Sequence, residues 1–224
     1  MKDNANMTKG KAFMVPFVLM VIMGLVLFAP AGSLKFWEGW VFLLEISILT
    51  FFIAAYFMKR NPELLARRMQ HGEKQTTIKT PVILKLYFLG YIIPGIDFHF
   101  HWSMVPDWAI IVSNIIVTAS YIFIIYVFKE NSFASTVVQV EKGQHIITTG
   151  PYAIVRHPMY LGLLLMSLFT PLALGSYWAI IPMLLFIPLI IIRIINEEKV
   201  LLCELHGYKD YCLKTRYRLI PLIW

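Results

Sequence analysis

Long runs of apolar residues alternate with short polar segments along almost the whole chain. A helix needs about 20 apolar residues to cross the roughly 30 Å hydrocarbon core of a bilayer. Runs of about that length predict six transmembrane helices. They cover residues 13–31, 38–58, 81–98, 107–128, 158–175 and 177–195. The pattern therefore predicts an all-α integral membrane protein with a cytoplasmic C-terminal tail. Little more than Gly175-Ser176 separates the last two spans, so we expect them to form a tight helical hairpin.

Composition supports this class. Of the 224 residues, 58% are hydrophobic and 15% are charged, against about 45–50% and about 25% in soluble domains. A soluble enzyme or a disordered chain would have more charged residues or fewer apolar residues than this chain has. The two cysteines, Cys203 and Cys212, are too few for a disulfide framework and lack the Cys-x-x-Cys spacing of redox and zinc sites.

Basic residues gather in alternate polar segments, which predicts the orientation. They lie before residue 13 and within 59–80, 129–157 and 196–224, whereas the other connections contain only Lys35. By the positive-inside rule these segments and both termini are cytoplasmic. Bilayer orientation thus explains the net charge of +7, and no nucleic-acid partner is expected. The first run is too long for a cleaved signal. The chain is typical of a bacterial or archaeal inner-membrane protein.

The chain divides into an N-terminal region, 1–128, with four spans, and a C-terminal region, 129–224, that contains the hairpin. Within the cytoplasmic loop 59–80, Asn61-Pro62-Glu63 combines an N-cap residue, a proline at the first helical position and an acid in the first turn. This predicts a short interfacial helix that carries Leu64, Leu65 and Met69.

One candidate site begins before the fifth span, in the segment 150–162. Pro158 can occupy the first helical position, where the neighbouring backbone N–H groups are unpaired and the helix dipole is positive. Arg156 and His157 add donors in the same place, so a carboxylate or phosphate would fit. The alternative is a basic helix start anchored among lipid headgroups.

A second group of charged residues ends the sixth span. Arg193 and Glu197 are four residues apart, so they share a helical face and can pair or bind one ligand. The alternative is an arginine that extends to the interface and is neutralised by Glu197. Glu198 adds a second acid, and such acids are uncommon at a span end. The hairpin therefore carries bases at one cytoplasmic end and acids at the other.

From about Asn131 to Trp224 the chain resembles the membrane methyltransferases of the isoprenylcysteine carboxyl methyltransferase and phospholipid methyltransferase group. The resemblance rests on the order and spacing of several motifs around one hairpin. These are 138–145, 149–152 with 156–162, Arg193 with Glu197-Glu198, 207–211 and 216–221.

The resemblance implies that S-adenosyl-L-methionine binds at the cytoplasmic end of the last helices and donates a methyl group to a lipid or prenyl-like acceptor. Arg193 would face the acceptor, as a catalytic residue that orients a carboxylate. Glu197 would be the second catalytic residue, as a base for an amine acceptor. The implied cofactor-binding residues are Gln139, His145, Ile146, Ile147, Tyr152, Arg156, His157, Pro158, Met159, Tyr160, Glu197 and Glu198.

Two other functions compete with methyl transfer. Sterol-reductase-like enzymes that use NADPH resemble the same region, but the chain shows no G-x-G-x-x-G motif. A non-catalytic membrane protein or small transporter would place Arg193 and the acids along a solute path. No metal is expected: Asp97, His99, His101 and Asp107 have a spacing that zinc can use, but loop histidines commonly have no such role.

Overall fold

The computed structural model describes residues 2–68, 80–134, 140 and 143–224, and across these the chain is helical without a β-strand. The all-α prediction is therefore confirmed. The elements are α1 (Lys2–Ala31), α2 (Trp37–Arg60), α3 (Pro62–Arg68), α4 (Thr80–Phe100), α5 (Asp107–Glu130), η1 (Gly150–Ala153), α6 (Pro158–Ala173), α7 (Ile180–Leu184), α8 (Phe186–Glu204) and α9 (Tyr208–Lys214).

Four helical segments in the described part of the chain are long and apolar enough to cross a membrane. They are Phe13–Ala31, Trp37–Arg60, Asp107–Glu130 and Ile180–Glu204. The predicted count of six spans is not confirmed. α4 overlaps the predicted span 81–98. The predicted span 158–175 is the 16-residue helix α6, which is about 24 Å long at 1.5 Å per residue and so falls short of the hydrocarbon thickness.

The last predicted span, 177–195, is placed incorrectly at both ends. The helical segment begins at Ile180, is interrupted at Leu185 and continues to Glu204. Pro188 explains the interruption, because its ring lacks an N–H and clashes with the carbonyl four residues earlier, that of Leu184. As a consequence, Glu197 and Glu198 lie inside α8, with a further turn and a half of helix after them, and not in a cytoplasmic tail.

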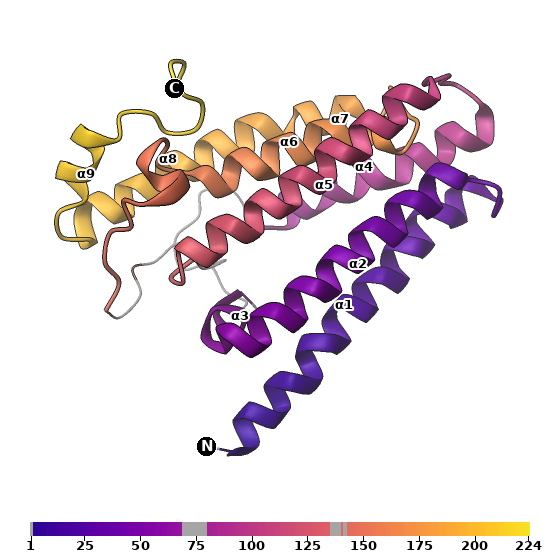
Figure 1. Ribbon diagram of the computed structural model, residues 1–224. Coiled ribbons are helices and arrows are strands. Elements are labelled where there is room, and N and C mark those ends of the chain that lie inside the picture. The colour runs from indigo at the N-terminus through magenta and orange to yellow at the C-terminus, as the bar shows by residue number, and fades with distance from the viewer. Residues whose placement is uncertain (1, 69–79, 135–139, 141–142) are drawn as a thin grey trace.

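The helices run side by side, and several ends meet at one end of the molecule (Figure 1). α5 packs along α6, while α1 packs along both α2 and α4. The start of α6, the end of α8 and all of α9 lie together at what we call the α9 end (Figure 1). Gly95 permits the close approach of α4 to α1, because a Cβ there would overlap the carbonyl oxygen of Leu27.

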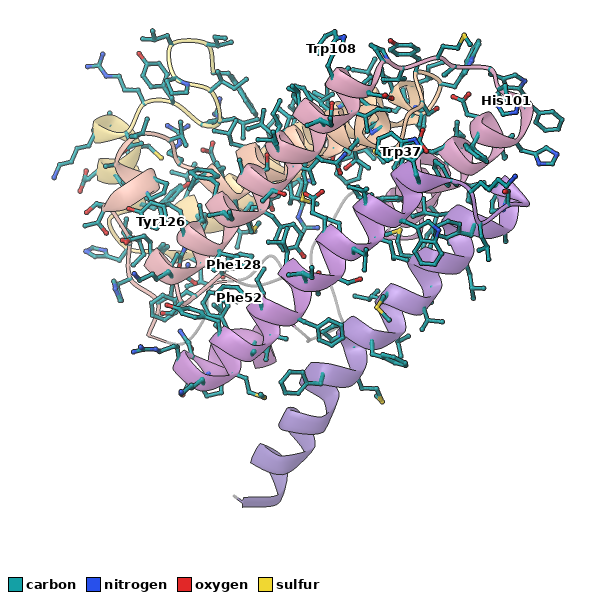
Figure 2. All side chains as sticks on the ribbon, turned by 45° about the vertical axis from the view of Figure 1, so that its right-hand side comes forward. Trp37, Phe52, His101, Trp108, Tyr126 and Phe128 are labelled. Atoms are coloured by element: carbon teal, nitrogen blue, oxygen red, sulfur yellow. The ribbon has the colours of Figure 1, made fainter. Side chains whose placement is uncertain are left out.

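The opposite end is rich in exposed aromatic side chains. Trp37, Trp40, Trp102, Trp108 and Trp178 are all at least two-fifths exposed there, and Figure 2 shows Trp37 and Trp108 at this end, far from Tyr126. Such a group is typical of a membrane–water interface. This placement supports a bilayer boundary at the end away from α9.

Asp97 joins two chain segments at this aromatic end. Its buried carboxylate accepts hydrogen bonds from the backbone N–H and hydroxyl of Ser103, at 2.7 and 2.6 Å, and from the hydroxyl of Ser176. His99 lies apart from it, with Nδ1 3.2 Å from the carbonyl oxygen of Ala31. The carboxylate thus holds the end of α4 to the turn that follows α6.

The short helix predicted after Asn61 is present as α3. The side chain of Asn61 accepts a hydrogen bond from the N–H of Leu64 at 3.1 Å, which is the expected N-cap contact. Leu64 is only 1% exposed and belongs to the same buried cluster as Phe57 and Phe128. This side chain therefore anchors α3 to the helix bundle. Met69 lies outside the described residues.

Candidate active site

The start of α6 is held by the C-terminal tail. Gly150, with a φ of 57°, begins the short helix η1, and Pro158 occupies the first turn of α6 as predicted. Between them, the N–H groups of Arg156 and His157 donate to the carbonyls of Tyr217 and Arg218, both at 2.9 Å. The tail therefore supplies acceptors for the two N–H groups that directly precede α6, so these two do not contribute free donors to the predicted anion site.

Glu198 is the centre of a buried charge cluster. One carboxylate oxygen accepts from Nε of Arg156 at 2.7 Å and lies 3.2 Å from Nε2 of His157. The other accepts from Nε of Arg218 at 2.7 Å. The side chains of Arg156, His157 and Glu198 are 7%, 4% and 6% exposed, whereas that of Arg218 is 37% exposed. We call these four residues the Glu198 cluster.

The cluster changes the predicted distribution of charge. The basic and acidic ends of the hairpin were expected to face one ligand from two sides, yet Arg156 and Glu198 bind each other. Nη1 of Arg156 also donates to two carbonyls of the tail, those of Thr215 and Arg216, at 2.9 Å each. Burial lowers the pKa of Arg156, but the hydrogen bond to Glu198 and its charge outweigh burial and raise the pKa, so the guanidinium stays charged. The cluster fixes α6, α8 and the tail together.

A hydrogen-bonded chain runs beside the cluster, from Arg193 through Tyr160 to Glu197. Nε of Arg193 donates to the hydroxyl of Tyr160 at 2.9 Å, and this hydroxyl donates to Glu197 at 2.7 Å. Arg193 and Glu197 share a face of α8 as predicted, and the buried Tyr160 of α6 bridges them. Because adjacent helical positions differ by about 100°, Glu197 and Glu198 serve these two separate networks.

Aromatic residues form the other side of the site. The hydroxyl of Tyr211 donates to the carbonyl of Tyr152 at 2.7 Å, and the amide of Asn131 donates to the Tyr152 hydroxyl at 3.0 Å. Burial raises the pKa of Tyr211 to about 12, so the donor keeps its proton at neutral pH. The rings of Phe133 and His145 meet edge to face, with centroids 5.0 Å apart.

Tyr208 contributes an unusual polar group. Its side chain is only 4% exposed. Its hydroxyl has no nitrogen or oxygen partner within hydrogen-bond geometry among the described residues, and the thiol of Cys212, a weak hydrogen-bonding group, lies beside it. Burial is the largest cause that raises the pKa of this hydroxyl, so it is protonated. A buried hydroxyl without a nitrogen or oxygen partner is costly in a folded protein and indicates a ligand or water that binds it.

All of these networks border one cavity, which we call the α6–α8 cavity. It measures about 900 Å³ including its opening to solvent. Of the predicted site residues, it is lined by His145, Ile146, Ile147, Tyr152, Arg156, His157, Pro158, Met159, Tyr160, Arg193 and Glu197. Glu198 is not part of the lining. Gln139 lies outside the described residues.

Sequence reasoning missed several lining residues. Val200 and Leu201 follow Glu197 by three and four positions, so helical periodicity could have found them. Leu205 extends the same face. No local pattern marks Asn131, Phe133 and Ala134, which reach the cavity only because the chain turns after α5. Gln144, Tyr208 and Tyr211 stood in the predicted motifs without an assigned position in the site.

The helices define a membrane protein, and a cavity with several polar lining residues lies at one end of them. Residues 108–208 match the model of the phospholipid methyltransferase family, which confirms the resemblance to phospholipid methyltransferase-like proteins over that stretch and indicates a membrane methyltransferase. The match covers α5 through the start of α9, and thus most of the cavity lining. No match to a curated protein was found.

Proposed function

We propose that this protein transfers a methyl group from S-adenosylmethionine to a membrane-embedded lipid or prenyl-like acceptor at the α6–α8 cavity. The observation that carries the proposal is the convergence of Arg193, Tyr160 and Glu197 on a cavity inside the matched region. Phospholipid methyltransferases generally use S-adenosylmethionine. Bound there, this cofactor would supply an electrophilic methyl group on a sulfonium.

The lining suits the chemical groups of the cofactor. Its carboxylate matches Nη2 of Arg156, the guanidinium group that the bonds to Glu198 and the tail do not use, with His157 lining the cavity beside it. Its ammonium matches Glu197. The faces of Tyr152 and Tyr160 suit a sulfonium cation. Apolar lining comes from Ile146, Ile147 and Met159, and the buried Tyr208 hydroxyl, which has no nitrogen or oxygen partner among the described residues, offers a hydrogen bond. We also propose roles for Gln139, as the resemblance implies, and for Glu198, which would position Arg156 and His157.

The chain's own residues then align the acceptor. Arg193, held by its hydrogen bond to Tyr160, would orient a carboxylate acceptor. For an amine acceptor, Glu197 would take up the proton that the amine must lose. Because methyl transfer needs alignment more than activation, this fixed geometry and the exclusion of water are the main contributions of the protein.

An apolar cavity supports a lipophilic acceptor. It lies between α1, α2, α3, α5 and α6, and Met159 lines both this cavity and the α6–α8 cavity. The lining is mostly apolar and includes Leu19, Ile53, Phe57, Tyr121, Ile124, Leu163 and Met166. A hydrocarbon chain in this space would have its reactive end beside Met159, close to Tyr160. We propose that the acceptor is a lipid amine or the carboxylate of a prenyl or lipid-like molecule.

The site also suggests an orientation. We propose that the α9 end faces the cytoplasm, because the basic segments 59–80, 129–157 and 196–224 follow or flank the helix ends that meet there. Both chain termini would then be cytoplasmic, in a bacterial or archaeal inner membrane. In this orientation the α6–α8 cavity would be open to the soluble cofactor in the cytoplasm, and the apolar cavity would lie at the depth of the bilayer.

Calorimetry tests the proposal. Full-length protein in detergent is titrated with S-adenosylhomocysteine and, separately, with NADPH. We expect heat with the first and none with the second. Glu197→Gln should weaken binding about 10-fold, the cost of one charged hydrogen bond. Glu204→Gln is the matched control, since Glu204 is exposed on the same helix. Heat with NADPH alone would support a reductase instead, and no heat with either would remove the enzymatic proposal.

The role of Arg193 needs a separate measurement. Arg193→Ala should leave the affinity for S-adenosylhomocysteine almost unchanged while methyl incorporation into the membrane lipids of expressing cells is lost. An equal loss of cofactor affinity would contradict a role toward the acceptor.

A further inference from the structure

A second site lies on the lipid-facing side of α2 and α5, toward the aromatic end. This α2–α5 groove is lined by Trp37, Val41, Glu45, Ile110, Ile111, Asn114, Ile115, Thr118, Ala119 and Ile122. Figure 2 shows Trp37 at the start of α2, away from the α9 end. The groove shares no lining residue with the α6–α8 cavity or with the apolar cavity.

Asn114, one of the lining residues, carries a buried acceptor. Its side-chain N–H₂ group donates to the carbonyls of Ile110, at 2.8 Å, and Ala173, at 3.4 Å. These two acceptors fix the orientation of the amide. The residue is 8% exposed, and its Oδ1 has no hydrogen-bond partner in the part of the chain that the structure describes. An unsatisfied carbonyl in a membrane region is costly, so a donor is expected to bind it.

Glu45 adds a second acceptor group. Thr118 donates to one oxygen of its carboxyl at 2.5 Å. Thr118 follows Asn114 by four residues, so the two share a face of α5 about 6 Å apart. The polar side-chain oxygens of Asn114 and Glu45 therefore gather in one part of the groove. The remainder of the lining is apolar, with Ile111, Ile115 and Ile122 along α5.

We propose that the α2–α5 groove binds a long-chain amphiphile whose head donates hydrogen bonds, namely an alcohol or a protonated amine. The head would donate to Oδ1 of Asn114 and to the carboxyl of Glu45, and the chain would lie along the isoleucines of α5. Hydrogen-bond complementarity selects this occupant, because the Asn114 acceptor needs a donor that hydrocarbon chains lack, and a carboxyl group that already accepts from Thr118 can accept further hydrogen bonds. The binding site is independent of the methyl-transfer site.

Thermal unfolding of the full-length protein in detergent tests the proposal. Hexadecanol and hexadecylamine are compared with hexadecyl methyl ether, which has the same chain but no donor. At ten times the Kd, binding should raise Tm by about 3 °C or more. The ether should leave Tm unchanged. If the Glu45 carboxylate attracts the ammonium, Glu45→Gln should remove any advantage of the amine over the alcohol.

Two variants give the decisive comparison. Ile115→Trp places bulk in the groove, so it should abolish the response to both donors. Ile48→Trp is the control, because Ile48 is 67% exposed on α2 and does not line the groove. An equal response to the ether, or a full response in Ile115→Trp, would overturn the proposal. A concentration-dependent dimer that Ile115→Trp dissociates would assign the groove to a second copy of the chain and would also overturn it.

Discussion

Removal of the carboxylate at Glu198 should be one of the most destabilising single changes in this protein. Glu198→Ala leaves the guanidinium of Arg156 buried at 7% exposure with no anion, and His157 at 4% exposure loses its acceptor. Loss of one partner of a buried ion pair costs about 3–5 kcal/mol. Arg218 adds little, because at 37% exposure solvent screens its charge. We therefore expect a loss of about 4 kcal/mol, and a fall in Tm of about 8–16 °C for a chain of this length.

Thermal unfolding in detergent, followed by tryptophan fluorescence, measures this fall. Glu204→Ala is the matched control, because Glu204 is exposed on the same helix, and its Tm should match that of the unmodified protein. Glu197→Ala should lie between the two, because Glu197 accepts a hydrogen bond from Tyr160 but does not pair with a buried cation as Glu198 does. If Glu198→Ala melts within about 2 °C of Glu204→Ala, the Glu198 cluster does not hold α6, α8 and the tail together.

Three further outcomes are expected. Tyr160→Phe keeps the buried ring but removes the hydroxyl that bonds both Arg193 and Glu197. Labelled-methyl incorporation should fall at least about 10–100-fold, the cost of one charged hydrogen bond, and Tm should fall at least as far as in Glu197→Ala, which loses one of the same bonds. Gly95→Ala should lower Tm measurably because its Cβ overlaps a backbone carbonyl of α1, whereas Gly10→Ala, which meets nothing within 4 Å, should not lower it; equal Tm values would contradict the close approach. A reporter fused after Trp224 should be cytoplasmic, and a periplasmic signal would reverse the proposed orientation.

Local patterns were sufficient for much of the fold. Apolar runs predict the helical class, and the N-cap at Asn61 and the proline at Pro158 mark helix starts that the structure confirms. The ends of the helices were harder to predict, because hydropathy does not indicate where the backbone hydrogen bonds of a helix stop. α8 continues to Glu204 through a polar stretch, since packing and buried ion pairs replace hydrophobicity there.

The sequence by itself determined which residues gather at the site. Helical spacing and the order of the motifs place the segments 156–160 and 193–198 at the same end of neighbouring helices. Only the tertiary structure decided their partners. A buried carboxylate must be satisfied by donors that are distant in sequence, so Glu198 binds Arg156 of the segment before α6 and Arg218 of the tail. Adjacent residues point in different directions around α8, so Glu197 instead accepts a hydrogen bond from Tyr160 and lines the cavity. Charge pairing of this kind depends on three-dimensional burial, which no local pattern encodes.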